Sequence, residues 1–192
     1  MKNVLKYPGS KWNIAPKLVS LIPKHHSYVE PYFGSGAVLF NKPESDIETV
    51  NDLDSDVTNL FRYIQKDAER LARLVMTTPF SREVYDKQFD IPDGAICVDP
   101  YERAAGFLIR CWQGHGFRTN GYKVGWKNDV HGREKMYALW NWYRLLEWVI
   151  EIAVCPPIPA ALVRANLPEL CVTERMPNMR IESEQTGQLR FA

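Results

Sequence analysis

A glycine turn between two apolar segments constrains the fold of this chain more than any other feature. Residues 28–40 read Tyr-Val-Glu-Pro-Tyr-Phe-Gly-Ser-Gly-Ala-Val-Leu-Phe. The first two suit the end of a β-strand, and Gly34 and Gly36 permit positive φ and a close approach to the backbone. The apolar run at 37–40 has the pattern of a helix start, whose free N–H groups attract polar or anionic groups. We therefore expect a strand, a turn and a helix, either as an ordinary connection or as a ligand cradle.

Two further segments flank this turn. Residues 5–11 read Leu-Lys-Tyr-Pro-Gly-Ser-Lys, and residues 47–54 read Ile-Glu-Thr-Val-Asn-Asp-Leu-Asp, which indicates a second strand ending in acids. A carboxylate at the end of the second strand of a βαβ unit is placed to accept hydrogen bonds from ribose hydroxyls. A glycine turn combined with such an acid is typical of a site for a nucleoside-containing cofactor.

In this order and spacing, the three segments resemble motifs of the adenine-specific DNA methyltransferases, the family of the Dam methylase. The resemblance covers residues 1–153 and implies an α/β fold. Residues 1–58 would form the N-terminal part of a Rossmann-like S-adenosylmethionine-dependent methyltransferase fold, and residues 59–153 a mainly helical DNA-recognition region. It also implies S-adenosyl-L-methionine as cofactor and double-stranded DNA as partner.

The resemblance implies a cofactor side drawn from all three segments. The candidates are Tyr7, Lys11, Glu30, Pro31, Gly34, Gly36 and Asp52. A carboxylate suits the positive charge of a sulfonium cofactor. Structural alternatives stay open, since Tyr7 can pack, Lys11 can be a solvated charge at a helix start, and Glu30 can form a salt bridge. Asp54 or Ser55 is expected to cap a helix over 57–75, with Leu60, Ile64, Leu71, Leu74 and Val75 on its apolar face. Ser81 is expected to cap a further helix.

A basic, glycine-rich stretch is the candidate DNA interface. Residues 102–135 hold seven Lys or Arg and three acids, so their net charge is 7 − 3 = +4. Within them, residues 113–127 interleave glycines and aromatics and are expected to form a loop or hairpin. Arg118, Asn120 and Lys123 would face DNA, because such side chains read base edges and hold phosphates. The alternative is a structural hairpin with a solvated face.

No residue is assigned a catalytic role. The family's Asp-Pro-Pro-Tyr motif is absent, and Asp99-Pro100-Tyr101 is one proline short of it. We interpret Asp99 as a helix cap, because an Asp followed by Pro at the first helical position is a common helix start. A helix is expected over 131–153, with its aromatic stripe in the core.

The composition changes after residue 153. Residues 154–192 contain five of the thirteen prolines, no Lys and no Asp, and are expected to form an atypical, disordered tail. We hypothesise a truncated or frameshifted coding sequence, and a divergent native tail is the alternative. With only two strands expected, the chain should be marginally stable and prone to aggregate.

Composition sets the remaining expectations. The net charge is +1, and none of the four cysteines has Cys-x-x-Cys spacing, so free thiols are expected. The His25-His26 pair lacks other ligands at metal-binding spacing, so no metal is expected. With neither a signal region nor a membrane-length apolar run, we expect a cytoplasmic protein, and the resemblance implies that it is encoded by a bacterium or phage. Oligomeric state, recognition sequence and biological setting, restriction-modification included, stay open.

The resemblance therefore implies a site-specific DNA adenine methyltransferase that transfers a methyl group from S-adenosylmethionine to N6 of adenine in double-stranded DNA. The missing motif makes a non-catalytic DNA- or cofactor-binding remnant the alternative. A third hypothesis is an unrelated nucleotide-binding α/β protein, which predicts that S-adenosylmethionine does not bind.

Overall fold

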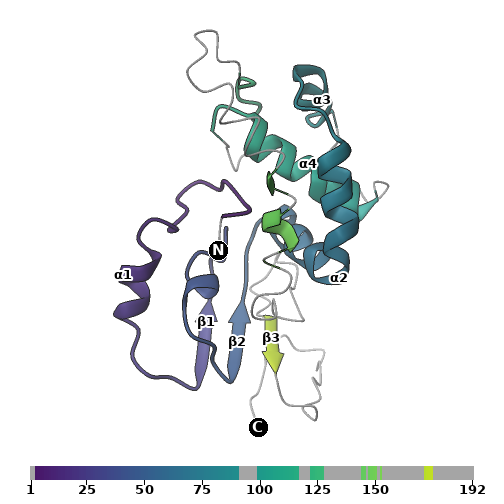
Figure 1. Ribbon diagram of the computed structural model, residues 1–192. Coiled ribbons are helices and arrows are strands. Elements are labelled where there is room, and N and C mark those ends of the chain that lie inside the picture. The colour runs from purple at the N-terminus through teal and green to yellow at the C-terminus, as the bar shows by residue number, and fades with distance from the viewer. Residues whose placement is uncertain are drawn as a thin grey trace, which may run out of the picture.

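The computed structural model describes residues 3–90, 99–116, 122–127, 144–145, 147–150, 152 and the backbone of 171–174 (Figure 1). In chain order the elements are α1 (Ala15–Ser20), β1 (Ser27–Glu30), the 3₁₀ helix η1 (Leu39–Asn41), β2 (Ile47–Val50), α2 (Ser55–Thr77), α3 (Arg82–Lys87), α4 (Pro100–Gln113) and β3 (Cys171–Glu174). The chain therefore mixes helices with a small sheet.

The sheet has the order β1-β2-β3. β1 and β2 are parallel, with Ser27 opposite Ile47 and Glu30 opposite Val50, so both strands end at the same edge. β3 is antiparallel to β2, with Cys171 opposite Val50. The expectation of only two strands was therefore wrong, since a Cys-Val-Thr-Glu segment of the proline-rich tail pairs with β2. The β-branched residues of this segment suit a strand. Its pairing with β2 could not be predicted locally, because the two strands are far apart in sequence.

The helix expected after the glycine turn is only the three-residue η1, so that part of the prediction was wrong. Pro43 disfavours helical geometry at the residue before it, and Lys42 accordingly has φ −88° and ψ 156°. The segment is too short to present a helix N-terminus to a ligand. Any binding at this turn must therefore come from its side chains and its own backbone.

Local capping signals predicted the helix starts well. The Asp54 side chain accepts a hydrogen bond from Asp56 N–H at 2.9 Å and begins α2. Ser81 Oγ accepts from Val84 N–H at 3.2 Å and begins α3. Asp99 Oδ1 accepts from Tyr101 N–H at 2.8 Å, which confirms that Asp99 is the cap of α4.

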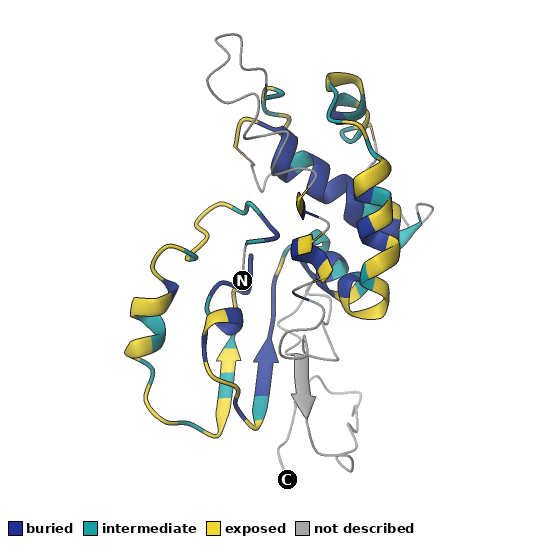
Figure 2. Ribbon diagram, viewed as in Figure 1, coloured by how far each residue is buried: buried dark blue, intermediate teal, exposed yellow. Residues whose placement is uncertain are grey.

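The core lies where α2 and α4 pack together, and Figure 2 shows α4 as the most continuously buried helix. Of the predicted apolar face of α2, Leu60, Ile64, Leu71 and Val75 are buried, and Leu74 is partly buried against the core. α2 is interrupted at Asp67, which has extended φ and ψ and whose Oδ1 accepts from Arg70 N–H at 2.9 Å.

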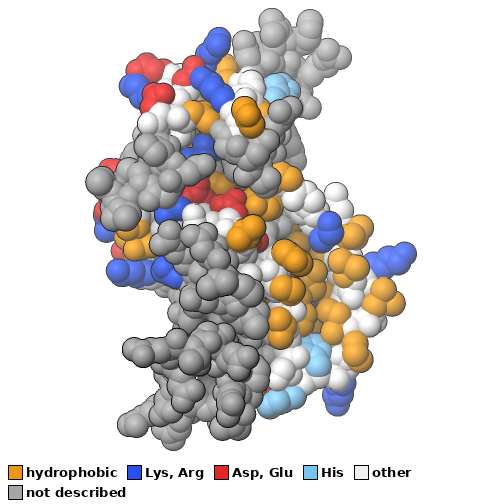
Figure 3. Space-filling view, turned by 180° about the vertical axis from the view of Figure 1, so that it is seen from behind, with side chains coloured by type: hydrophobic (Ala, Val, Ile, Leu, Met, Phe, Trp, Pro, Cys, Tyr) orange, Lys and Arg blue, Asp and Glu red, His pale blue; other side chains and the backbone are white. Residues whose placement is uncertain are grey.

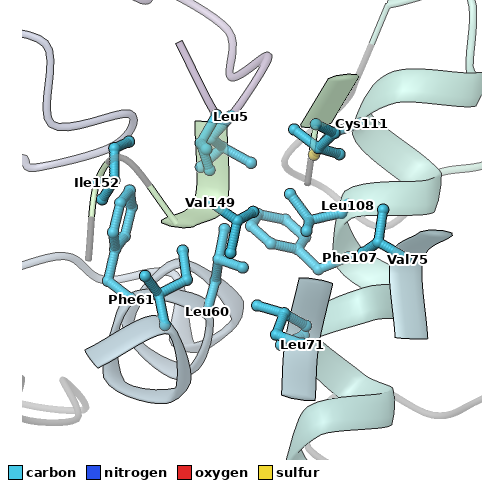
Figure 4. Close-up of a cluster of buried hydrophobic side chains, with 14 of the residues drawn as sticks. Leu5, Leu60, Phe61, Leu71, Val75, Phe107, Leu108, Cys111, Val149 and Ile152 are labelled. Atoms are coloured by element: carbon cyan, nitrogen blue, oxygen red, sulfur yellow. The ribbon is translucent and has the colours of Figure 1, made fainter. Parts of the chain in front are cut away.

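Residues 144, 145, 147–150 and 152 are helical, as predicted for that part of 131–153. Figure 4 shows Val149 and Ile152 among the side chains of Leu60, Phe61 and Phe107. Trp148 is also buried and lies 5.5 Å from the Trp112 ring, so this part of the aromatic stripe belongs to the core.

Exposed apolar side chains gather on the side of α1 and β1, which is visible from behind in Figure 3. They include Ile14, Leu21 and Val29, which are 48%, 71% and 52% exposed. In the described ranges, no helix is long and apolar enough to cross a membrane.

Candidate functional site

The glycine turn is fastened to the end of β2. Asn51 N–H donates to Glu30 O at 3.0 Å, and Phe33 N–H donates to Asn51 O at 2.9 Å, so the chain leaving β1 runs beside the chain leaving β2. Gly34 N–H then donates to Asp52 Oδ2 at 2.6 Å, while Asp54 N–H donates to Asp52 Oδ1 at 2.9 Å. Asp52 is 7% exposed and links the two strand ends.

Both glycines of the turn adopt the positive φ that their positions require. Gly34 has φ +51° and Gly36 has φ +66°. At Gly36 an added Cβ would lie 2.4 Å from Phe40 Cε2 and 2.7 Å from Phe33 Cζ, so the turn has no room for a side chain there.

The N-terminal segment, residues 3–11, lies against this turn. The Tyr7 hydroxyl donates to Asp54 Oδ2 at 3.0 Å, and its Cδ1 lies 3.3 Å from where a Cβ on Gly34 would be. The Ser10 and Ser35 Oγ atoms are 2.8 Å apart. Burial, followed by the nearby Asp54 and Asp52 carboxylates, raises the pKa of Tyr7 far above its ordinary value, so the phenol stays protonated and donates.

Two other candidates lie in exposed positions and make hydrogen bonds that involve none of the acids of the turn. Lys11 Nζ donates to Gly9 O at 2.7 Å, and Lys11 is exposed. Pro31 is exposed, and its carbonyl accepts from Asn51 Nδ2 at 3.2 Å. The geometry thus brings Tyr7, Gly34 and Asp52 together, whereas the Lys11 ammonium hydrogen-bonds to Gly9 of its own segment.

Glu30 ends β1 with a largely desolvated carboxyl group. The Tyr28 hydroxyl donates to Glu30 Oε2 at 3.1 Å. Burial raises the pKa of Glu30 to about 7, although the Tyr28 hydrogen bond, the Leu39 N–H and Lys42 act in the opposite direction. Near neutral pH this carboxyl is therefore poised between its two protonation states.

This shift predicts a pH-dependent stability. Between the ordinary value of 4.5 and about 7, the unfolded chain ionises Glu30 while the folded protein keeps it protonated. The free energy of unfolding should therefore fall as pH rises through this window, by about 3 kcal/mol, and level off above it. Urea unfolding of wild type and Glu30→Gln at several pH values measures this, because the variant lacks the titration.

The matched control is Glu69→Gln, since Glu69 has an exposed side chain and an i,i+4 ion pair with Arg73. Its stability should follow pH as the wild type's does. A Glu30→Gln variant whose stability parallels that of wild type from pH 4.5 to 7 would contradict the assignment.

Sequence reasoning missed a buried polar network beside the site. Lys42 Nζ is 2.6 Å from Glu48 Oε1 and 2.8 Å from Ser45 Oγ, and the Lys42 side chain is 1% exposed. Ser45 Oγ also lies 2.7 Å from His25 Nε2. Charges six residues apart around a proline resemble surface charges, so only the folded chain reveals this pair. The described residues contain no cluster of three or more His, Cys, Asp or Glu that could hold a metal ion.

The predicted DNA interface is described only in part. Arg118 and Asn120 lie outside the described residues. The ends of the predicted hairpin are confirmed, because Gly114 bridges Trp126 and His115 N–H donates to Gly125 O at 2.7 Å. Lys123 Nζ is 2.8 Å from Asp86 Oδ1.

Two of the seven basic residues counted for this interface are engaged elsewhere. Arg103 Nε is 2.6 Å from Asp56 Oδ1, and Arg110 pairs with the other oxygen of the same carboxylate. Both arginine side chains are largely buried, at 22% and 13% exposure. Their charge joins α4 to the first turn of α2, so the stretch presents less positive charge than its sequence indicates.

Comparison with known proteins identifies the family. The family model for the D12 class of N6 adenine-specific DNA methyltransferases matches residues 7–111, which is more than half of the chain. This chain belongs to the D12 class. The D12 match contains every cofactor-side candidate from Tyr7 to Asp52, whereas Arg118, Asn120 and Lys123 lie beyond it.

Individual relatives carry corresponding names. A DNA N-6-adenine-methyltransferase of Escherichia phage P1 is 23% identical over 146 residues, covering 70% of this chain and 18% of the relative. The Type II methyltransferase M1.LlaDCHI of Lactococcus lactis subsp. cremoris is 31% identical over 142 residues, covering 68% and 47%. A DNA adenine methylase of Salmonella typhi is 28% identical over 108 residues, covering 54% and 38%. This D12 chain thus matches less than half the length of these three relatives.

Proposed function

We propose that this chain binds S-adenosyl-L-methionine at the shared end of β1 and β2 and acts in methyl transfer to N6 of adenine in double-stranded DNA. The observation that carries the proposal is the Asp52 carboxylate, which holds Gly34 of the glycine turn at 2.6 Å. Gly34 and Asp52 both lie within residues 7–111, which the D12 family model matches.

The residues present suit this cofactor. Asn51 Oδ1 is buried and lacks a hydrogen-bond partner among the described residues, so it is an acceptor that a ligand hydroxyl or amine can satisfy. Asp52 uses two of the about four lone-pair sites of an ionised carboxylate, which leaves acceptor capacity. Glu30 supplies a largely desolvated carboxyl group, and a positively charged ligand would favour its ionised form. When bound, S-adenosylmethionine supplies an electrophilic methyl group.

The finer architecture belongs to the same proposal. Residues 1–58 would be the cofactor-binding part of a Rossmann-like methyltransferase fold, and residues 59–153 a mainly helical DNA-recognition region. Arg118, Asn120 and Lys123 would face DNA, and Lys123 would exchange Asp86 for a phosphate. Relatives from a phage and from bacteria support the interior of a bacterial or phage-infected cell as the location of this chain.

Calorimetry of the full chain with S-adenosylmethionine tests the proposal. Asp52→Ala removes the acceptor of Gly34 N–H and the proposed ribose acceptor together, so we expect the affinity to fall by about a hundredfold. Asp46→Ala is the control, because Asp46 is exposed and pairs with His26 away from the turn. Asp46→Ala should bind as the wild type does.

Transfer of a labelled methyl group to adenine in DNA is measured in parallel. Binding with turnover supports the whole proposal. Binding without turnover restricts this chain to the cofactor-binding part of the reaction. No binding to wild type, or equal binding to Asp52→Ala, contradicts the proposed site.

A further inference from the structure

Four groups around the glycine turn form a closed ring of contacts. The Tyr7 hydroxyl donates to Asp54, the Asp54 N–H donates to Asp52, Asp52 accepts from Gly34 N–H, and the Tyr7 ring returns to lie against Gly34. The four contacts therefore join three segments: the N-terminal segment, the residues that follow β2, and the turn itself.

Asp54 divides its carboxylate between two tasks. Oδ1 accepts from Asp56 N–H at 2.9 Å and caps α2, while Oδ2 accepts from Tyr7 at 3.0 Å. A helix cap needs one acceptor oxygen, and Ser, Asn and Asp provide it about equally well. The second oxygen is thus not needed to begin α2, and the contact it makes belongs to the glycine turn.

The N-terminal segment has an anchor that does not depend on Tyr7. Trp112 Nε1 donates to Val4 O at 2.7 Å, and Val4 and Leu5 are fully buried. Residues 7–11, by contrast, are mostly exposed or half-buried and reach the turn through Tyr7–Asp54 and Ser10–Ser35. Loss of the Tyr7 hydroxyl should therefore loosen residues 7–11 without releasing residues 3–5.

We propose that Asp54 is a positioning residue that holds Tyr7 against Gly34, so that residues 7–11 form a preformed wall of the S-adenosylmethionine site. This inference rests on the proposed function. Because residues 7–11 are ordered before the ligand binds, binding does not carry the entropic cost of ordering them. Loss of the hydrogen bond between Tyr7 and Asp54 therefore weakens the affinity for S-adenosylmethionine.

A double-mutant cycle on the full chain tests the inference by calorimetry with S-adenosylmethionine. Tyr7→Phe keeps the ring, which also packs edge-on to Phe107 at 6.5 Å, and removes only the hydroxyl. Asp54→Ser keeps a helix cap and removes the oxygen that accepts from Tyr7. Each single variant should bind S-adenosylmethionine about tenfold more weakly than the wild type does. The double variant should also bind about tenfold more weakly than the wild type, because the two substitutions remove the same interaction.

Tyr85→Phe is the matched control, since it also deletes a buried tyrosine hydroxyl, which donates to Val124 O at 2.7 Å away from the turn. It should lower thermal stability and leave the affinity unchanged. Amide hydrogen exchange adds a readout without ligand: in Tyr7→Phe, exchange should speed up at Ser10, whose N–H donates to Tyr7 O, and not at Leu5.

The outcomes separate the two proposals. Failure of the wild type to bind S-adenosylmethionine overturns the proposed function and this inference with it. If the wild type binds and Tyr7→Phe binds equally well, the inference alone is overturned. An additive, about hundredfold loss in the double variant also overturns it, because the two groups would then act separately.

Discussion

Gly36→Ala is expected to lower the free energy of unfolding by about 3 kcal/mol and to abolish S-adenosylmethionine binding. The added Cβ would lie 2.4 Å from Phe40 and 2.7 Å from Phe33, and both rings are buried against Phe61 with ring centroids 5.8 and 4.8 Å away. The two rings therefore have little room to move, so the added methyl group overpacks the core. A second cost to stability arises because a residue with a Cβ is strained at the φ of +66° found at Gly36. Urea unfolding measures the loss.

Gly116→Ala separates the two contributions. Gly116 has φ +78°, and a Cβ there would meet nothing within 4 Å. It should therefore show only the backbone cost, about 1 kcal/mol, and leave cofactor affinity unchanged. Equal losses in the two variants would mean that the packing of Phe33 and Phe40 does not shape the turn.

Glu48→Ala should be the second severe substitution, lowering the free energy of unfolding by about 3 kcal/mol or more. It leaves the Lys42 ammonium, 1% exposed, without its carboxylate at 2.6 Å. An uncompensated buried charge is strongly destabilising, whereas replacing both members of such a pair by apolar residues is often nearly neutral. The double variant Lys42→Met with Glu48→Leu should therefore recover most of the loss in urea unfolding.

The control for this pair is an exposed pair of the same residue types. Lys87 and Glu83 lie 2.7 Å apart on α3, with side chains 66% and 78% exposed. Glu83→Ala should leave the stability unchanged within error, because surface ion pairs contribute little. If the double variant at Lys42 and Glu48 were as unstable as Glu48→Ala, the cost would come from lost packing and not from the stranded charge.

Local patterns predicted what depends on residues near each other in sequence. Asp54, Ser81 and Asp99 cap helices because a cap requires only a side-chain oxygen two or three residues from a free N–H. The positive φ of Gly34 and Gly36 and the apolar face of α2 were predicted for the same reason. By contrast, the helix after the turn was overestimated, because an apolar run of four residues says little about length.

The remaining features depend on groups that only the folded chain brings together. The pairing of β3 with β2, the engagement of Arg103 and Arg110 by Asp56, and the buried Lys42–Glu48 pair have no signature in residue spacing. The contact of Tyr7 with Asp54 joins residues 47 positions apart, and its partner could not be read from either motif.

By itself, the sequence determined the order of the motifs, the helix starts and the membership of the D12 class, because these rest on local chemistry and on matching residue types. Only the tertiary structure decided which carboxylate holds which segment. The sequence indicated a cofactor-side role for Asp52 and a helix cap at Asp54 or Ser55, but only burial and geometry direct Asp52 to the Gly34 amide and the second oxygen of Asp54 to the Tyr7 hydroxyl. The physical reason is that hydrogen bonds and desolvation depend on distances within a few ångströms, which folding sets and sequence separation does not.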